Sequence, residues 1–398
     1  MADVCARSRA AQVAGTAASP GPATLIQSRT EALKLQIPAD VAVVIPHYNR
    51  ADLLRLTIDS VLQQSAACRV IVVDDGSDTD QWQRIQLYAD SQVQVLRRAD
   101  GPKGPSRSRN VGWQQSDCPF VMFLDSDDLL GGWCLQQRLA AIAEFPEADA
   151  WVFPVLLFRN HPGDLRILWN QMAESGDLER FLVSDPPWHT SSTLWRRSAL
   201  ERLGGFNEVV MYGDDADLHT RALFGGIRFQ RMTAAVPDVF VRRSDANRIT
   251  NGVSAWLLNS RLVRLSEGSR LLLHFGTDSQ RRLWQGQYFR ECEYLLFQVP
   301  GSWGRICGVL RQWKREWPRA GLAWWIACFY LAVACATRRH AYLLLRIARR
   351  VAMRLMPVGC FPQPGGFECT SLDAAMERRV ELLLAGRNGL MPSENRDL

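Results

Sequence analysis

Residues 41–46 read VAVVIP, a short run of apolar, mostly β-branched side chains that ends at Pro46. Such a run predicts a buried strand of a parallel sheet. Further strand-like runs and helix-like stretches follow in alternation: 51–64 (helix), 68–78 (strand), 93–96 (strand), 104–115 (helix) and 120–124 (strand). This alternation predicts an α/β fold with a Rossmann-like, mostly parallel sheet flanked by helices.

Polar residues follow three of the predicted strands. The segments are IPHYN at 45–49, VDDGS at 73–77 and LDSDD at 124–128. In an open parallel sheet, the carboxyl ends of the strands meet at one edge, and ligands bind outside that edge. The sequence therefore predicts a polar binding cleft formed by these three segments.

The composition is that of an ordinary globular protein, with 47% apolar and 22% charged residues in a chain of 398. The formal charge of +6 gives no reason to expect nucleic-acid binding, because the basic residues concentrate late in the chain. The ten cysteines form no CxxC pair, which favours reduced, cytosolic thiols. The N-terminus has no continuous apolar core of the kind that a signal peptide needs.

Three regions are predicted from changes in composition. Residues 1–38, rich in Ala, Ser, Thr, Gly and Pro, are expected to form a disordered extension. Residues 39–250 are expected to form the α/β domain, and residues 251–398 a helical region. Within the α/β domain, the apolar run 148–158 predicts a strand interrupted by Pro154, which suggests an edge or a bulge position.

The helical region has two features that suggest contact with a membrane. Residues 320–336 form an uncharged apolar run with basic residues on both sides, which is at the short end of what spans a bilayer. The following helix, 341–356, is basic and amphipathic, with Arg346, Arg350 and Arg354 on one face. We expect association with an anionic membrane surface rather than a span, although a soluble packing region is the alternative.

The acids in DSDD suggest a metal site. Asp125 and Asp127 could bind Mn²⁺ or Mg²⁺, because such hard cations prefer oxygen ligands and take the remainder from substrate phosphates. Acids that merely cap a helix or face water are the alternative. A calcium-binding EF-hand is excluded, because Leu130 and Gln136 stand where that loop needs Gly and Glu.

No phosphate-binding loop of the Walker or dinucleotide type is present in the sequence. Instead Lys103, Arg107 and Arg109 lie together in GPKGPSRSRN, between the third and fourth predicted strands. They could neutralise phosphates, or they could belong to a solvated basic loop.

Five segments in order resemble family 2 glycosyltransferases of the GT-A fold. They are VAVVIPHYNR, IVVDDGSD, KGPSRSRNVG, FLDSDD and LGGFNEVVMYGDDADLHTRAL, and the resemblance extends over residues 40–245. It implies that Pro46, Tyr48 and Asn49 help to hold the nucleotide and that Asp75 bonds its base. It also implies that Asp125 and Asp127 bind the cation that bridges the donor diphosphate.

The resemblance also implies roles for residues that follow the first three strands. Arg109 matches the usual Arg of an Arg-Asn pair, with Ser108 in place of a common Ala. Asp214 and Asp215 match an acid pair at the start of a late helix, with Asp214 near the substrate and Asp215 as the general base. An acidic first helical turn is the alternative reading of this pair.

The segment 184–197 lies where the family places residues that face the acceptor. Trp188 is expected to stack on a sugar ring and His189 to bond a hydroxyl, or both belong to the core.

The function expected is inverting transfer of a sugar from a nucleotide-diphosphate donor, most simply a UDP-sugar, to a hydroxyl of a glycan or glycolipid. We expect a cytoplasmic enzyme, peripheral on the inner face of the plasma membrane, in cell-surface polysaccharide or glycolipid synthesis. The alternatives are a metal-dependent nucleotidyltransferase and a non-catalytic nucleotide-sugar-binding scaffold at a membrane.

Overall fold

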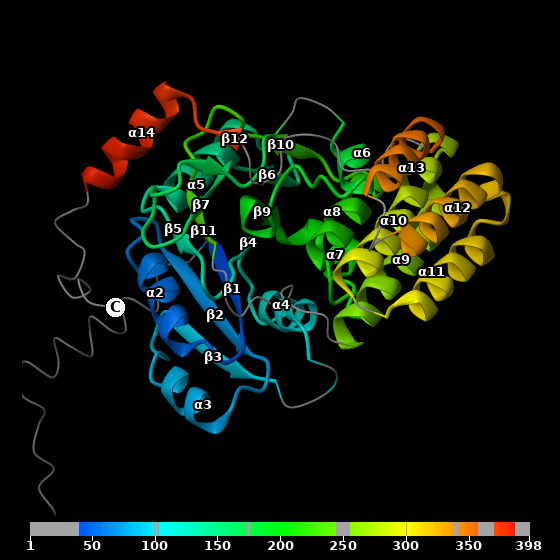
Figure 1. Ribbon diagram of the computed structural model, residues 1–398. Coiled ribbons are helices and arrows are strands. Elements are labelled where there is room, and N and C mark those ends of the chain that lie inside the picture. Colours follow the sequence, from blue (N-terminus) through cyan, green and yellow to red (C-terminus); the bar gives the residue numbers. More distant parts are fainter. Residues whose placement is uncertain are drawn as a thin grey trace, which may run out of the picture. The chain divides into compact units, whose positions relative to one another are not determined.

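The computed structural model describes residues 40–98, 101, 103–172, 176–243, 255–299, 301–337, 342–356 and 370–386. The predicted extension 1–38 and the predicted boundary at 250/251 both lie outside the described residues. The α/β sheet and the helical C-terminal region, both predicted, are confirmed (Figure 1).

A mixed sheet of seven strands, counted over the described residues, forms the centre of the α/β domain. Four strands, β3, β2, β1 and β4, run parallel to one another, whereas β9 is antiparallel to both β4 and β6. In spatial order the strands are β10 (Phe229–Arg231), β6 (Ala150–Val152), β9 (Thr193–Arg196), β4 (Phe120–Phe123), β1 (Val41–His47), β2 (Cys68–Asp74) and β3 (Val93–Arg97).

A second sheet lies next to the acidic segment 125–128. Its order is β12 (Thr370–Ser371), β8 (Ile167–Leu168), β7 (Val155–Phe158), β11 (Val239–Arg242) and β5 (Leu129–Leu130). β5 follows directly on the predicted metal-binding acids and pairs with β11, which fixes those acids between the two sheets. Pro154, predicted to interrupt one strand, separates β6 from β7, and these belong to different sheets.

Helices cover the central sheet. They are α2 (Ala51–Leu62), α3 (Thr79–Gln86), α4 (Pro105–Gln114), α5 (Cys134–Glu144), α6 (Asp177–Leu182), α7 (Arg197–Leu203) and α8 (Asp214–Phe224). The helix α4 lies close to the sheet at Gly112, where an added Cβ would stand 2.3 Å from Cγ1 of Val44. Because nothing larger than glycine fits there, α4 carries its polar N-terminal side chains close to the ends of β1 and β4.

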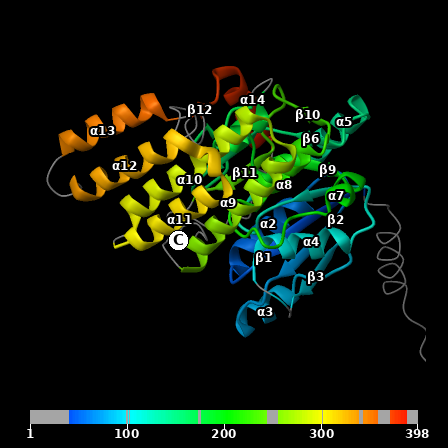
Figure 2. The same cartoon turned by 90° about the vertical axis from the view of Figure 1, so that its right-hand side faces the viewer.

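The C-terminal region consists of α9 (Ala255–Phe275), α10 (Asp278–Gln298), α11 (Trp303–Glu316), α12 (Gly321–Thr337) and α13 (Tyr342–Leu355), followed by α14 (Ala374–Ala385). Figure 2 shows α9 to α13 side by side. Their apolar core includes the buried Trp284, Tyr288 and Trp313. This group meets the α/β domain where α9 contacts α8 and α10 contacts α6.

A buried ion pair joins Arg138 of α5 to Asp238, the residue just before β11. Arg138 of α5 donates through Nε and Nη2 to the two carboxylate oxygens of Asp238, at 2.9 and 2.8 Å, and both side chains are fully buried. Nη2 also donates to the carbonyl of Ser191 at 3.0 Å, which anchors the short turn that carries His189. Removing one partner of such a pair leaves an uncompensated buried charge.

We therefore expect Arg138→Met to lower the free energy of unfolding by about 3–5 kcal/mol, measured by urea denaturation. Arg55→Met is the matched control, because Arg55 pairs with Asp59 at the surface at 3.9 Å and such pairs contribute about 1 kcal/mol or less. Equal losses in the two variants would contradict the structural role of Arg138. Combining Arg138→Met with Asp238→Leu should recover part of the loss.

Candidate active site

Arg109, on the first turns of α4, joins two acidic segments that are about ninety residues apart in sequence. Its Nη2 donates to Oδ1 of Asp125 at 2.6 Å, and its Nη1 donates to Oδ2 of Asp214 at 2.5 Å. Burial opposes the charge of Arg109, but Asp214 and Asp125 outweigh it and raise its pKa further above the ordinary value. One cation thus holds the end of β4 against the start of α8.

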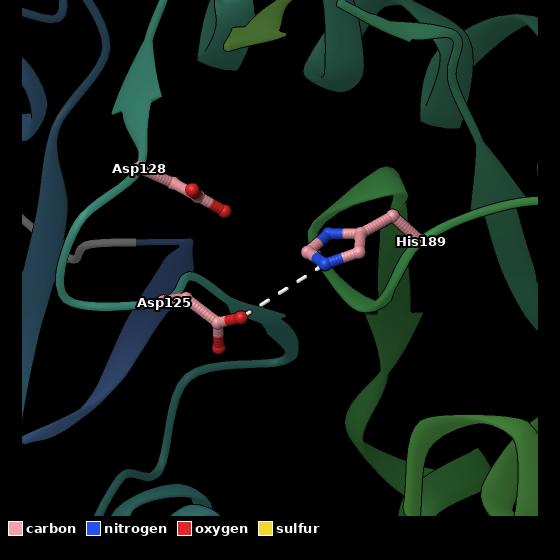
Figure 3. Close-up of side chains that lie close together, drawn as sticks. All are labelled: Asp125, Asp128 and His189. Atoms are coloured by element: carbon pink, nitrogen blue, oxygen red, sulfur yellow. Dashed lines mark ion pairs between the residues drawn. The ribbon is translucent and has the colours of Figure 1, made fainter. Parts of the chain in front are cut away.

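A possible metal-binding group lies beside this bridge. Asp125, Asp128 and His189 offer ligand atoms that all lie within 4.8 Å of one another (Figure 3). Nε2 of His189 is 3.9 Å from Oδ2 of Asp125. Oδ2 of Asp128 is buried and, within the described part of the chain, has no hydrogen-bond partner. Two carboxylates and an imidazole thus lie close together, and one of the carboxylate oxygens lacks a hydrogen-bond partner among the described residues. Such a group of ligand atoms fits a divalent cation such as Mn²⁺ or Mg²⁺.

Asp127, the predicted second ligand, is differently engaged. Its Oδ2 accepts a hydrogen bond from Nη1 of Arg50 at 2.8 Å, while Nε of Arg242 donates to its carbonyl at 3.1 Å. The structure therefore groups Asp128 and His189 with Asp125, and a metal contact through Asp127 stays a prediction. The sequence offered a signal for Asp128, which belongs to the same DSDD stretch.

The pKa values of Asp125, Asp127 and Asp128 are shifted in different directions. Burial raises the pKa of Asp128 well above its ordinary value, and Asp127 and Asp125 raise it further. Burial also raises the pKa of Asp127, with Asp125 as the next cause. For Asp125, burial acts in the same direction, yet Arg109 and His189 outweigh it and the pKa is lowered. Asp125 is thus the carboxylate of this group that the fold keeps ionised most strongly.

The two acids at the start of α8 have different surroundings. Asp214 is buried, accepts from Arg109 and from Oγ of Ser106, and its pKa is raised to about 6, chiefly by burial. Asp215 is half-buried, and among the described residues it has no ion-pair partner within salt-bridge distance. Its charge acts on both Arg109 and His189, so it lies beside the acidic group. Its Oδ1 accepts from the backbone N–H of Ala216 at 2.8 Å, so Asp215 is the acid of this pair that Arg109 does not bind.

Most of the residues predicted to hold a nucleotide also lie close to one another. Oδ1 of Asp75 accepts from Nε of the buried Arg98 at 2.9 Å, and Oδ2 accepts from the backbone N–H of Gly104 at 2.7 Å. The ammonium of Lys103 lies 4.3 Å from the ring centre of Tyr48 and donates to the carbonyl of Gly76 at 2.9 Å. Lys103 therefore stands beside Tyr48 and the loop after β2, and its predicted contact with phosphates stays a prediction.

Neighbouring backbone shapes the same corner of the cleft. Asn49 has a φ of 50°, an unusual value for a residue other than glycine, and its N–H donates to Oγ of Ser77 at 2.8 Å. Pro46 lies within β1 opposite Val73 of β2. The loop after β1 is thereby tied to the loop after β2.

Of the two readings given for Trp188, the structure favours the core residue over the sugar-stacking one. Its side chain is 2% exposed and packs edge-on against Phe181 and His219, with Phe229 also in contact. It is a core residue and cannot stack on a sugar in this conformation. The adjacent His189 faces Asp125 instead of an open acceptor site.

Comparison with known proteins gives the family of the chain. Residues 42–203 match the model of the family described as Glycosyl transferase family 2. The succinoglycan biosynthesis protein ExoU of Rhizobium meliloti is 30% identical over 248 residues, which cover 59% of this chain and 70% of that protein. The chain belongs to glycosyl transferase family 2.

Other similarities are consistent with this family 2 membership. The pre-mycofactocin glycosyltransferase of Mycobacterium tuberculosis is 31% identical over 206 residues, 48% of this chain but only 40% of that protein. The crystal structure of Staphylococcus aureus TarS 1-349 in complex with UDP-GlcNAc superposes with a TM-score of 0.56 at 16% identity. It covers 81% of this chain and 90% of that one, and it confirms the predicted GT-A-like fold.

The candidate site includes residues that the sequence did not single out. Arg98 stands at the end of β3 and pairs with Asp75 across neighbouring strands, and Arg50 pairs with Asp127 from the first turn after β1. Arginines are common in this chain, so neither has a sequence signal of its own.

The raised pKa of Asp214 predicts a pH-dependent stability. Because its folded pKa of about 6 lies above the ordinary 3.8, the stability linked to its protonated form is present below about pH 4 and is lost as the pH rises through about 6. Asp214→Asn cannot ionise. The free energy of unfolding of the wild type relative to this variant should fall by up to about 3 kcal/mol between pH 4 and pH 7. Urea denaturation in EDTA measures it, and a difference that does not change with pH would contradict the burial of this charge.

Proposed function

We propose that this chain is an inverting glycosyltransferase that moves a sugar from a UDP-sugar to a hydroxyl acceptor. The observation that carries the proposal is the Arg109 bridge, because it holds Asp125 and Asp214 together and so sets Asp215 beside the possible cation site. Family membership supports the reaction class. The relatives named above include a polysaccharide biosynthesis protein and a glycosyltransferase.

The residues divide into two tasks. Asp125, Asp128 and His189, with Asp127 as a further candidate, would hold Mn²⁺ or Mg²⁺, which when bound neutralises charge on the departing diphosphate. Asp215 takes the proton of the acceptor hydroxyl as that oxygen attacks the anomeric carbon. Asp214 is assigned to positioning rather than to proton transfer, because its carboxylate is bound by Arg109 and by Ser106. Single displacement on the face opposite the diphosphate inverts the configuration.

The surroundings of Asp75 favour uracil over guanine. A carboxylate offers about four lone-pair positions, and here Nε and Nη2 of Arg98 both bind Oδ1 while the N–H of Gly104 binds Oδ2. One acceptor position remains for a base. Uracil presents a single ring N–H, whereas guanine presents a ring N–H and an amino group side by side and would need two acceptors.

Asp75→Asn tests this recognition. We expect the affinity for UDP, measured by calorimetry with Mn²⁺ present, to fall about 10- to 100-fold, because a hydrogen bond to a charged acceptor is lost. GDP should bind the wild type more weakly than UDP. Asp80→Asn is the control, since Asp80 is exposed on the first turn of α3 close by. Wild-type protein that binds GDP as tightly as UDP would refute the argument.

Asp215→Asn tests the reaction itself. Sugar transfer or donor hydrolysis from a UDP-sugar with Mn²⁺ should fall about 10²- to 10⁴-fold, because a general base is lost, while UDP affinity should stay within about twofold. Asp217→Asn makes the same change two residues along α8, where the carboxylate pairs with Arg221, and should retain most of the activity.

Three outcomes would overturn this assignment. A near-normal rate in Asp215→Asn would show that Asp215 is not the general base. Release of pyrophosphate from a nucleoside triphosphate would indicate a nucleotidyltransferase instead. Thermal stabilisation by UDP-sugars across a full screen of donors and acceptors, with no turnover, would indicate a non-catalytic scaffold.

We further propose a cytoplasmic enzyme that works at the inner face of the plasma membrane on a glycan or glycolipid acceptor. One support is that a relative is named for succinoglycan biosynthesis. The other is the apolar stretch Pro318–Ala336, which is long and apolar enough to cross a membrane by length and composition only.

A further inference from the structure

The outer helices α12 and α13 expose apolar rows that the rest of the described chain leaves uncovered. On α12, Leu322, Trp325 and Phe329 follow one another at helical spacing and are 72%, 66% and 71% exposed. On α13, Ile347, Val351 and Leu355 stand four residues apart and are each about half exposed or more. A soluble monomer rarely exposes so much apolar surface on neighbouring helices.

The opposite faces of both helices are used for packing. Ala327, Tyr330 and Leu331 of α12 are buried, and the hydroxyl of Tyr330 donates to Glu293 of α10 at 2.8 Å. Ala352 of α13 and Met356 just after it are buried, and neither belongs to the exposed row. Each helix therefore has one face committed to the helical region and one apolar face directed outward.

Charge distinguishes this surface from an ordinary apolar patch. On α13, Arg350 and Arg354 are exposed and stand beside the apolar row, three residues after Ile347 and Val351 respectively. Lys314, Arg315 and Arg319 are exposed just before α12. The sequence from residue 317 to residue 356 contains no Asp or Glu. An apolar face edged by cations and free of carboxylates is complementary to anionic lipid headgroups above acyl chains.

The geometry favours a helix pair that lies in the membrane surface over one that crosses it. Length alone leaves a span open: the 17 residues of α12 extend about 26 Å, against roughly 30 Å for a bilayer's hydrocarbon core, and the stretch Pro318–Ala336 is just long enough to cross. The indole N–H of Trp324 donates to the carbonyl of Leu310 at 2.9 Å, which ties α12 to α11. A spanning α12 would have to give up this bond and the buried row as well.

We propose that the outward faces of α12 and α13, defined by Leu322, Trp325, Phe329, Ile347, Val351 and Leu355, form an in-plane docking surface for an anionic lipid bilayer. This deepens the membrane location proposed above, but it does not depend on the transfer reaction. α12 contacts α10, and α10 contacts α6 of the α/β domain, so the docking surface is connected to the catalytic domain through packed helices.

Vesicle flotation of the full chain tests the proposal. The protein should float with vesicles of phosphatidylcholine mixed with phosphatidylglycerol and stay behind with phosphatidylcholine alone. The double variant Trp325→Glu, Phe329→Glu should lose binding to the anionic vesicles. The double variant Arg350→Glu, Arg354→Glu should weaken it more than about tenfold, because each basic residue near the surface strengthens binding several-fold.

Matched controls keep the result interpretable. Leu87→Glu places the same charge at a residue that is 83% exposed on the α/β domain, and it should float like the wild type. Unchanged melting temperatures show that the variants fold. Asp215→Asn should float normally, so failure of the proposed reaction and failure of this surface are separable.

Other results would overturn the proposal. Equal binding to neutral and anionic vesicles would show that the basic residues do not direct the protein to anionic lipid. Resistance of the bound protein to carbonate extraction would indicate a span. A dimer in the absence of lipid that Trp325→Glu, Phe329→Glu converts to a monomer would make a second copy of this chain the occupant.

Discussion

The arrangement of the site depends on one buried guanidinium. Arg109 reaches from α4 to Asp125 at the end of β4 and to Asp214 at the start of α8. Both carboxylates are taken largely out of water, where an unpaired charge is costly, so their closeness is tolerated because Arg109 lies between them. The position of Arg109 depends in turn on the close approach of α4 to the sheet at Gly112.

Beyond this bridge, the acidic group carries more carboxylates than the nearby cations can balance. Oδ2 of Asp127 accepts from Arg50, and Oδ1 of Asp128 accepts from the backbone N–H of Arg242, whose side-chain charge also acts on both acids. Burial and mutual repulsion therefore raise the pKa of Asp128 and Asp127. A divalent cation with a diphosphate would supply the missing charge balance, which is why crowded acids at a strand end suit chemistry on a sugar nucleotide.

The helical region is joined to the base-bearing helix. α9 contacts α8, and Cδ of Arg264 on α9 stands 3.0 Å from the place of a Cβ at Gly213, the residue that precedes Asp214. Gly213 has a φ of 66°, so the turn into α8 needs glycine for its conformation as well as for this contact. The helices that would meet a lipid surface thus belong to the same packed body as the start of α8.

The sequence by itself determined the alternation of strands and helices, the polar strand ends and the family motifs, because periodicity and turn residues act over a few neighbours. It also indicated Arg109, Asp125, Asp214 and Asp215, each of which stands in a recognisable segment. Only the tertiary structure decided which side chains meet: Arg109 with two acids, Asp128 and His189 with Asp125, Arg50 with Asp127, and Trp188 with the core. These contacts join residues far apart in sequence, and they follow from how helices and loops pack on the sheet, which no local pattern specifies.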